Sequence, residues 1–447
     1  MKGLTVPRSV RHAQRSVRER LPNFRVHRSG ILAFLGVMGP GLIAGLAGND
    51  AGGITTYSVL GAQTGFSLLW ILPVTTVMLV IVLEMAARMG AVSGQGLGDL
   101  IRDDFGIRWT LFAMVVLLLA NGANIIAEFA GAAAALEIFG IPRFVTVPVV
   151  AAGIWALVVF ASYRVVERVF LSVAVVFGAY VVSAFVAGPN WGAVGHALIS
   201  PSLSLQPDVL LLTIATIGTT VTPYMFFYLQ SSVADKGLGP EELGLERADA
   251  IIGAVWTNVI ALFIVIVTAV TLFGHGVILN TAAEAARALA PMAGQFAEAL
   301  FAFGLFGASV LAATVMPLTT SYTVCESFGW ESGVSRKFHE APVFMGLYTA
   351  LIVIGAVVVL VPGLPLIGVI LISQNLNGIL LPIILVFMLR LVNNPRIMGR
   401  YVNPFWLNVV AWALTAFVTL LTAILFGTTI AGWFGFGLGP GSGSPTP

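Results

Sequence analysis

The chain has 447 residues, of which 58% are hydrophobic and only 9% are charged, and its formal net charge is +2. Soluble domains carry about 25% charged residues, so this composition excludes a soluble enzyme, a disordered chain and a nucleic-acid-binding protein. It is typical of a polytopic all-α membrane protein. The single cysteine, Cys325, excludes an intrachain disulfide and a cysteine-based zinc site.

The N-terminal residues 1–29 are too polar to cross a bilayer and are rich in arginine, which predicts a basic cytosolic tail. Residues 30–430 predict a transmembrane domain of 11 spans, since a spanning helix needs about 20 apolar residues. The predicted spans are 31–66, 68–88, 109–137, 144–161, 167–188, 207–234, 250–273, 294–325, 341–361, 364–389 and 404–427. The Gly/Ser/Pro-rich residues 431–447 predict a flexible tail.

Two predicted spans are interrupted. The first contains the glycine-rich segment Gly45–Gly53, and the sixth contains three threonines before Pro223. Interrupted helices at matching positions of two five-helix halves are typical of inverted-repeat transporters with a midplane site. We therefore expect a 5+5 inverted repeat, with halves over 31–188 and 207–389 and an extra helix over 404–427. The span count and the two breaks carry this prediction.

The placement of the cationic residues orients the chain. With the N-terminus inside, every Lys and Arg except Arg143 and Arg287 falls in the tail or at the inner side of the membrane. This asymmetry predicts a cytoplasmic N-terminus and an outside C-terminus for a multi-pass protein of the cell membrane. The loop that holds Glu241, Glu242 and Glu246 is interpreted as a solvated linker on the inner side.

Most of the acids fall in loops or at the ends of predicted spans, and three lie further in: Asp50, Glu84 and Glu128. An ionisable residue inside the bilayer is by default a functional candidate. No Lys or Arg sits in the middle of a span to neutralise these acids, so an unpaired carboxylate there needs a cation from elsewhere. Glu84 stands one turn before Arg88, which we interpret as an i,i+4 pair whose arginine reaches the membrane surface.

The two breaks offer oxygen ligands. Asp50 lies in the first break, where it predicts a cation ligand, a cap of the second half-helix, or both. In the second break Pro223 deprives carbonyls near Thr219 of their helical donor, and Thr222 adds a hydroxyl. A cation can satisfy these groups. An ordinary proline kink with threonine back-bonding is the alternative.

Other polar residues line up with the breaks. Asn121, Asn124 and Glu128 share one helix face, which indicates either a proton or ion path or a buried structural network. Gln374 leads a group of amides in the tenth span, where it is a ligand or a packing residue. Tyr224 follows the second break and is interpreted as lining the path or packing beside it.

A series of motifs, in order and at consistent spacing, resembles the Nramp family of divalent metal-ion transporters over about residues 39–426. The motifs are Gly39-Pro40-Gly41-Leu42, Gly61–Trp70, Ala87–Gly94, Glu128–Gly131, Ala299–Leu305 and Ser373-Gln374 with Leu381-Pro382. The resemblance implies a LeuT-like fold with broken helices 1 and 6. It also implies that the metal ion is the transported substrate, with no cofactor.

The site motifs depart from the family's pattern. The family's Asp-Pro-Gly-Asn reads Asp50-Ala51-Gly52-Gly53, so the asparagine ligand is replaced by Gly53. Its Met-Pro-His reads Thr222-Pro223-Tyr224. A hydroxyl therefore replaces the thioether, and Tyr224 replaces the histidine that the family links to proton transfer. The family's span 3 aspartate corresponds to Ile125. The resemblance assigns the metal site to Asp50, Thr219, Thr222, Gln374 and the position of Gly53.

These departures change the expected chemistry. A thioether favours transition metals, so its loss leaves an oxygen-rich site that suits Mg²⁺ as well as Mn²⁺. With the histidine and one aspartate missing, we expect weak proton coupling or none, along a path of Glu128, Asn124 and Tyr224. The alternative is a symporter of the same fold that carries a small organic solute, with Gly52 and Gly53 making room for it. We expect no catalytic activity, because no HExxH motif or Ser/His set is present. We also expect the protein to be a monomer.

Overall fold

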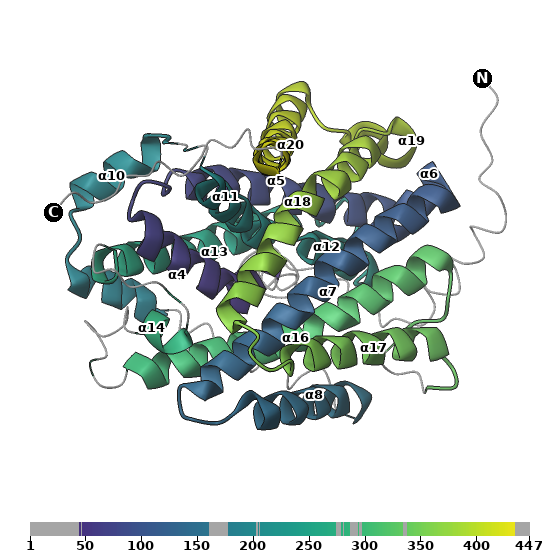
Figure 1. Cartoon of the computed structure of the whole chain (residues 1–447). Coiled ribbons are helices and arrows are strands. Elements are labelled where there is room, and N and C mark those ends of the chain that lie inside the picture. The colour runs from purple at the N-terminus through teal and green to yellow at the C-terminus, as the bar shows by residue number, and fades with distance from the viewer. Residues whose placement is uncertain are drawn as a thin grey trace, which may run out of the picture. The chain divides into compact units, whose positions relative to one another are not determined.

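The computed structural model describes residues 44–45, 47–160, 178–202, 204, 206–273, 279, 281–286, 294, 297–333 and 338–433. In these ranges all regular structure is helical (Figure 1). The predicted tail over 1–29, the first half of the first span and residues 434–447 lie outside them.

The described residues form a series of helices. In chain order they are η1 (Ala47–Asn49), α4 (Ala51–Thr64), α5 (Ile71–Ser93), α6 (Leu97–Phe105), α7 (Ile107–Glu137), α8 (Arg143–Phe160), a helix over Gly178–Ala187, α10 (Trp191–Ile199), α11 (Pro207–Thr220), α12 (Pro223–Asp235), α13 (Leu243–Thr271), α14 (Ala282–Ala286), α16 (Ala297–Phe328), α17 (Pro342–Val359), α18 (Leu366–Val392), α19 (Pro395–Met398), η4 (Gly399–Tyr401) and α20 (Phe405–Trp433).

The described helices agree with the predicted spans. Eight helices are long and apolar enough to cross a membrane when α11 and α12 are taken together, and two shorter apolar helices, Arg143–Val158 and Gly178–Ala187, fall in the fourth and fifth predicted spans. The all-helical fold prediction is confirmed. Helices α6 and α10 lie in segments predicted as loops, and α20 continues to Trp433, beyond the predicted end at 427.

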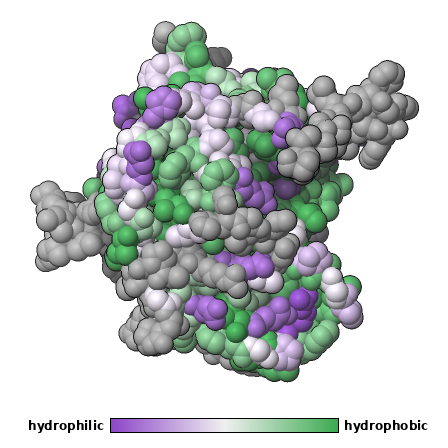
Figure 2. Space-filling view, turned by 60° about the vertical axis from the view of Figure 1, so that its left-hand side comes forward, coloured by the Kyte–Doolittle hydropathy of each residue, from purple (hydrophilic) through white to green (hydrophobic). Residues whose placement is uncertain are grey.

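The surface of the helical domain has the apolar character that a bilayer requires. Large hydrophobic side chains with about half or more of their surface exposed include Trp109, Leu119, Phe303 and Phe405. Hydrophobic residues form much of the face drawn in Figure 2, between smaller polar groups. In water such an area would be an association site, whereas in a bilayer it contacts lipid.

The first break is a tight turn between η1 and α4. Asp50 is the N-cap of α4, and its Oδ1 accepts a hydrogen bond of 2.8 Å from the Gly53 backbone nitrogen. The segment lies close to α13, because a Cβ on Gly45 would approach the Gly253 carbonyl carbon to 2.3 Å. The Thr257 hydroxyl on α13 donates to the Gly45 carbonyl. The glycines therefore let the broken segment reach the backbone of its neighbour.

The second break separates α11 from α12 at Val221 and Thr222. Pro223 is the first residue of α12, where a missing backbone donor costs nothing. Helix α18 crosses α11 closely: a Cβ on Gly218 would lie 2.2 Å from the Gln374 carbonyl oxygen, and one on Gly378 would lie 2.4 Å from the Ile214 carbonyl oxygen. These two glycines bring the amide-bearing face of α18 against the second break.

Two interpretations of charged residues need correction. Arg88 does pair with Glu84, but its side chain is buried among protein atoms and does not reach solvent. Glu246 is also fully buried, and neither of its carboxylate oxygens has a hydrogen-bond partner in the described residues, so the linker interpretation is wrong for this residue. The helical period explains it, because Glu246 lies on the same face of α13 as the buried Asp249.

Candidate functional site

The two helix breaks meet α7 and α18 at a buried polar cluster. Helix α4 contacts α7, α11 and α18. A Cβ on Gly52 would lie 2.1 Å from Gln374 Nε2 and 3.1 Å from Asp50 Oδ1, so the Gln374 amide lies over the first turn of α4 beside Asp50. Only glycine at position 52 permits this approach. The structure thus brings together the aspartate of the first break and the glutamine of α18.

Asp50 and Glu128 form the acidic centre of the cluster. Their exposed fractions are 5% and 0%, and their carboxyl groups are close enough to interact. The Ala51 backbone nitrogen donates to Glu128 Oε2 at 3.2 Å, so the first turn of α4 binds both acids. None of the ion pairs among the described residues involves either carboxylate. A cation placed here would meet two carboxylates without a protein counter-charge.

The Thr222 hydroxyl follows the back-bonding alternative, and the Thr219 hydroxyl does not. The Thr222 hydroxyl donates to the carbonyl oxygens of Gly218 and Thr219, each at 3.0 Å. The proline break therefore leaves these carbonyls partly satisfied by a side chain. Their remaining lone pairs, and those of the Thr222 oxygen, are still available as acceptors. The Thr219 hydroxyl is buried and has no partner in the described residues.

An amide network joins α7 to α18. Gln374 Nε2 donates to Asn124 Oδ1 at 3.1 Å, and Asn377 Nδ2 donates to Gln374 Oε1 at 3.2 Å. Asn121 Nδ2 donates to Thr320 Oγ1 on α16 at 2.8 Å. The interhelical hydrogen bonding that the polar stripe indicates is therefore present. The network is incomplete, because Asn124 Nδ2 and Asn377 Oδ1 have no partner in the described residues.

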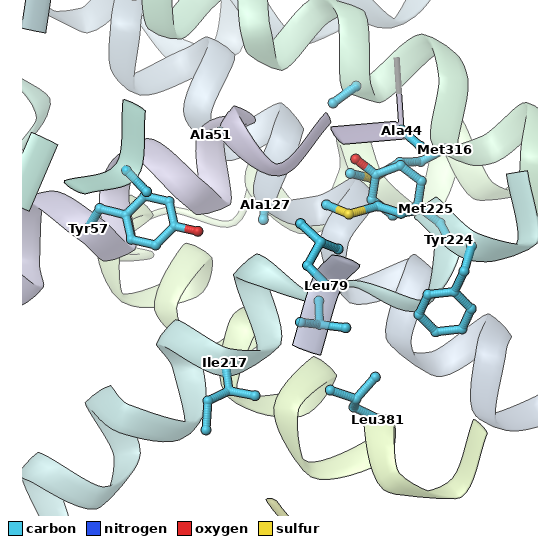
Figure 3. Close-up of a cluster of buried hydrophobic side chains, with 14 of the residues drawn as sticks. Ala44, Ala51, Tyr57, Leu79, Ala127, Ile217, Tyr224, Met225, Met316 and Leu381 are labelled. Carbon is cyan, nitrogen blue, oxygen red and sulfur yellow. The ribbon is translucent and has the colours of Figure 1, made fainter. Parts of the chain in front are cut away.

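Tyr224 and Gly53 complete the set of candidate residues. Tyr224 is 1% exposed at the start of α12 and lies near enough to Asp50 and Glu128 to feel both charges. It belongs to the buried cluster of Figure 3, with Met225 of the same helix, Tyr57 of α4 and Leu381 of α18. Tyr57 pairs with Thr220 Oγ1 at 2.9 Å and so links α4 to α11. Gly53 contributes its backbone nitrogen to the Asp50 cap.

One residue of the first break escaped the sequence analysis. Asn49 is 1% exposed and precedes Asp50, and neither its Oδ1 nor its Nδ2 has a partner in the described residues. The signal was present in the sequence as an amide next to the acid in a glycine-rich break. Asn377, which the sequence suggested only as one of several amides, is fully buried in the network.

The donor set of this cluster is carboxylate and neutral oxygen. In the described part of the chain no group of three or more His, Cys, Asp or Glu residues is placed to hold a metal ion. Any cation in the cluster would bind the two carboxylates together with amide, hydroxyl and carbonyl oxygens. Such a set suits hard cations and differs from a histidine- or thiolate-based metal site.

The fold and the cluster define a class of protein. The chain superimposes on MhsT, whose structure was solved in complex with L-phenylalanine, with a TM-score of 0.56 at 13% identity over 87% of this chain and 97% of that one. It superimposes on the manganese transporter of Eremococcus coleocola, in complex with an aromatic bis-isothiourea substituted compound, with a TM-score of 0.74 at 22% identity over 94% and 91% of the two chains. The fold is that of the LeuT-like membrane transporters.

The sequence comparisons identify the family. The chain is 26% identical over 413 residues to the divalent metal cation transporter MntH of Granulibacter bethesdensis, a match that covers 88% of this chain and 89% of that protein. Residues 41–428 match the natural resistance-associated macrophage protein-like family, Nramp. The chain belongs to the Nramp family. The resemblance seen in the sequence motifs is confirmed, and the relatives are transporters, not enzymes.

Proposed function

We propose that this protein is a secondary transporter that moves a divalent metal cation across the cell membrane by alternating access. The ion is Mn²⁺, Mg²⁺ or both. The protein works as a monomer with its N-terminus in the cytoplasm and its C-terminus outside. The repeats over 31–188 and 207–389 move against each other around the ion, and the helix over 404–427 lies outside this pair.

The observation that carries the proposal is the pair of buried carboxylates at the first helix break. Asp50 and Glu128 interact with each other, and no ion pair of the described residues reaches them. Buried charges are stable when they are paired or bind metal. A transported divalent cation supplies the missing positive charge. The divalent metal cation transporter MntH and the manganese transporter among the similar proteins agree with a cargo of this kind.

Individual residues have distinct parts in the proposal. Asp50 is the principal ligand, and Gln374 offers its side-chain oxygen from α18. Thr222 and the Thr219 carbonyl contribute secondary oxygens at the second break, and the backbone at Gly53 keeps Asp50 in place through the cap. Because a hydroxyl stands where the family carries a thioether, discrimination against Mg²⁺ is weak.

Proton coupling is weak or absent in this proposal. Glu128 is the one carboxylate beside Asp50 on the route through α7, and Asn124 and Tyr224 continue it with groups that do not titrate near neutral pH. A route with so few titratable groups carries few protons, so a proton gradient drives the transport of the metal ion only weakly. Internal pH therefore changes little while the ion enters.

The alternative of a small organic solute depended on room beside two glycines. A Cβ at Gly52 would lie 2.1 Å from Gln374 Nε2, and one at Gly53 would lie 2.2 Å from the Gly48 carbonyl oxygen. The space that these glycines free is therefore filled by protein atoms. No other observation favours an organic solute over a metal ion.

The test is uptake into liposomes that hold purified protein and a pH-sensitive dye. Mn²⁺, Mg²⁺ and Ca²⁺ are offered in turn to the wild type and to Asp50→Asn. The matched control is Asp208→Asn, which changes an exposed acid in the first turn of α11. We expect uptake of Mn²⁺ and Mg²⁺ with little acidification, loss in Asp50→Asn and no change in Asp208→Asn.

Each part of the proposal has its own contrary result. If no divalent ion enters, or if Asp50→Asn transports as well as the wild type, the metal-transport proposal is wrong. If Mn²⁺ is taken up and Mg²⁺ is refused, the inference from Thr222 fails. If uptake acidifies the vesicle lumen in proportion to the ion, the inference on coupling fails.

A further inference from the structure

We infer that the end of the first half-helix, through the Asn49 side chain and the Gly48 carbonyl oxygen, supplies the oxygen ligands that the Nramp asparagine motif supplies elsewhere in the family. Gly53 occupies the position of that asparagine and has no side chain. The inference rests on the proposed function and assigns two further ligands to the same ion site.

Asn49 is the first support. Its side chain is 1% exposed, and neither Oδ1 nor Nδ2 has a hydrogen-bond partner in the described residues. Leaving an amide buried and unpaired costs roughly 1–3 kcal/mol, so such a group calls for a role. Asn49 immediately precedes Asp50, and it ends the short helix η1 at the break itself. Its amide oxygen has no partner among the described residues and stands next in sequence to Asp50, and we assign it to a cation bound there.

The Gly48 carbonyl is the second support. A Cβ built on Gly53 would lie 2.2 Å from the Gly48 oxygen and 3.1 Å from its carbonyl carbon. The carbonyl oxygen therefore lies where an asparagine at position 53 would begin its side chain. Among the described residues, the hydrogen bonds that tie the break to its surroundings go to Asp50 Oδ1, Glu128 Oε2 and the Gly45 carbonyl, and not to this oxygen.

Together these atoms explain why the motif can lose its asparagine. Both backbone carbonyl oxygens and side-chain amide oxygens are ligands of hard cations. The amide moves from the third position after Asp50 to the position immediately before it, and the Gly48 carbonyl adds a second oxygen. The site therefore stays oxygen-rich without a side chain at Gly53. The amides of Asn124, Gln374 and Asn377 are engaged in hydrogen bonds within α18 and between α18 and α7, whereas Asn49 has no partner in the described residues.

The test is calorimetric titration of the purified full chain in detergent with MnCl₂ and with MgCl₂. Asn49→Leu keeps the side-chain size and removes its polar atoms. We expect at least a tenfold loss of affinity, a typical size for the loss of a group that binds or orients a metal ligand. We also expect the metal-free variant to unfold at the same temperature as the wild type or higher, because an unpaired buried amide is gone.

The matched control is Asn258→Leu on α13. Asn258 is also buried with an unpartnered Oδ1, but its Nδ2 donates to Ala254 within its own helix. This variant is expected to keep wild-type affinity. Gly53→Ala tests the carbonyl, because its Cβ displaces the Gly48 oxygen, and we expect a similar tenfold loss. Gly122→Ala on α7 controls for it, since nothing lies within 4 Å of the added atom.

The outcomes separate the two proposals. If Asn49→Leu binds both ions as tightly as the wild type, or if it loses affinity and metal-free stability together, the assignment of Asn49 is wrong and metal transport is untouched. If Gly53→Ala folds and keeps its affinity, the assignment of the carbonyl is wrong. If the wild type binds neither ion, the proposed function fails first, and this inference with it.

Discussion

Two buried acidic regions of this molecule differ in how their charge is neutralised. In the C-terminal half of α5, Glu84 contacts Arg88 at 3.0 Å and Arg247 of α13 at 2.7 Å. At the start of α4, Asp50 and Glu128 interact with each other, and no arginine or lysine of the described residues pairs with them. One region holds its own counter-charge and the other lacks it.

The paired region also has its remaining donors satisfied. Arg88 donates to the Tyr401 carbonyl and to Asn403 Oδ1, so that one guanidinium ties α5 to the segment before α20. In the unpaired region, by contrast, Glu128 Oε1, Asn124 Nδ2 and both polar atoms of Asn49 lack partners in the described residues. A complete network stabilises a fold, whereas an incomplete one leaves positions for a ligand. The following predictions test this difference.

The largest effect is expected from Arg88→Met in the paired region. Removing one partner of a buried pair costs about 3–5 kcal/mol when the other charge is left without compensation, and the pairing of Glu84 with Arg247 keeps this loss toward the lower end. Here Glu84 would keep only Arg247, and the Tyr401 carbonyl would lose its donor. Thermal unfolding can be followed by labelling of the buried thiol of Cys325, the single cysteine of the chain.

Arg143→Met is the matched control, because the Arg143–Glu137 pair is partly exposed, with side-chain exposures of 18% and 36%. It should cost no more than about 1 kcal/mol. Equal losses in Arg88→Met and Arg143→Met would mean that the buried network adds no stability of its own.

Asp50→Asn in the unpaired region should act in the opposite direction. The amide oxygen can still cap Gly53, and the variant removes a buried charge beside Glu128, so the metal-free protein should unfold at an equal or higher temperature. A divalent ion at 100 times its dissociation constant should stabilise the wild type by about 2.7 kcal/mol and should not stabilise Asp50→Asn.

The stabilisation by the cation should depend on the unpaired region alone. Chelation of the metal should lower the unfolding temperature of the wild type and of Arg143→Met equally, and leave that of Asp50→Asn unchanged. Metal-dependent stabilisation of Asp50→Asn would place the ion outside the acidic pair.

Gly378→Ala should have a smaller effect than these charge changes. Its Cβ would lie 2.4 Å from the Ile214 carbonyl oxygen and would push α18 away from α11. Overpacking of this kind costs about 1–3 kcal/mol. Since α18 carries Gln374, uptake of the metal ion should fall as well. Gly346→Ala on α17, which has nothing within 4 Å of the added atom, should be neutral or stabilising in the same assays.

Most of the fold could be predicted from the sequence, because apolar runs and glycine- or proline-rich breaks are local signals. The breaks beside Asp50 and Pro223 are where the pattern placed them. The Asp50 cap, the Glu84–Arg88 pair and the amide contacts of Gln374 also follow from spacing along single helices or from polar residues inside apolar ones.

Contacts between distant segments could not be predicted in this way. Nothing in the sequence near Arg88 indicates that Tyr401 and Asn403 bury it, and nothing near Glu246 distinguishes a buried face from a solvated linker. The Thr222 hydroxyl could have pointed to a ligand or back to its own helix, and only the backbone geometry of the break decides between these. Asn49 was overlooked because Asp50 already explained the polarity of the break.

A third acidic group, Asp99, has both a like charge and an opposite charge beside it, so it is intermediate between the paired and the unpaired region. Its substitution has the smallest expected effect on stability. Asp99 on α6 has a pKa raised above its ordinary value, chiefly by burial and then by Asp103, with Arg102 acting in the opposite direction. The native carboxyl therefore holds its proton more tightly than the unfolded chain does. Its contribution to stability is full below the unfolded value near pH 4 and is lost as the pH rises through the native pKa.

Asp99→Asn removes this pH dependence. We expect the variant to be more stable than the wild type at pH 7, by less than about 1 kcal/mol because the site is only partly buried, and the difference should vanish toward pH 4. Unfolding temperatures between pH 4.5 and 8 measure it. Asp103→Asn, which removes the second cause of this raised pKa and leaves the burial, should give a smaller gain with the same pH dependence. A gain in Asp99→Asn that is constant with pH would mean that shape rather than charge limits the stability of α6, and that Asp99 belongs with neither acidic region.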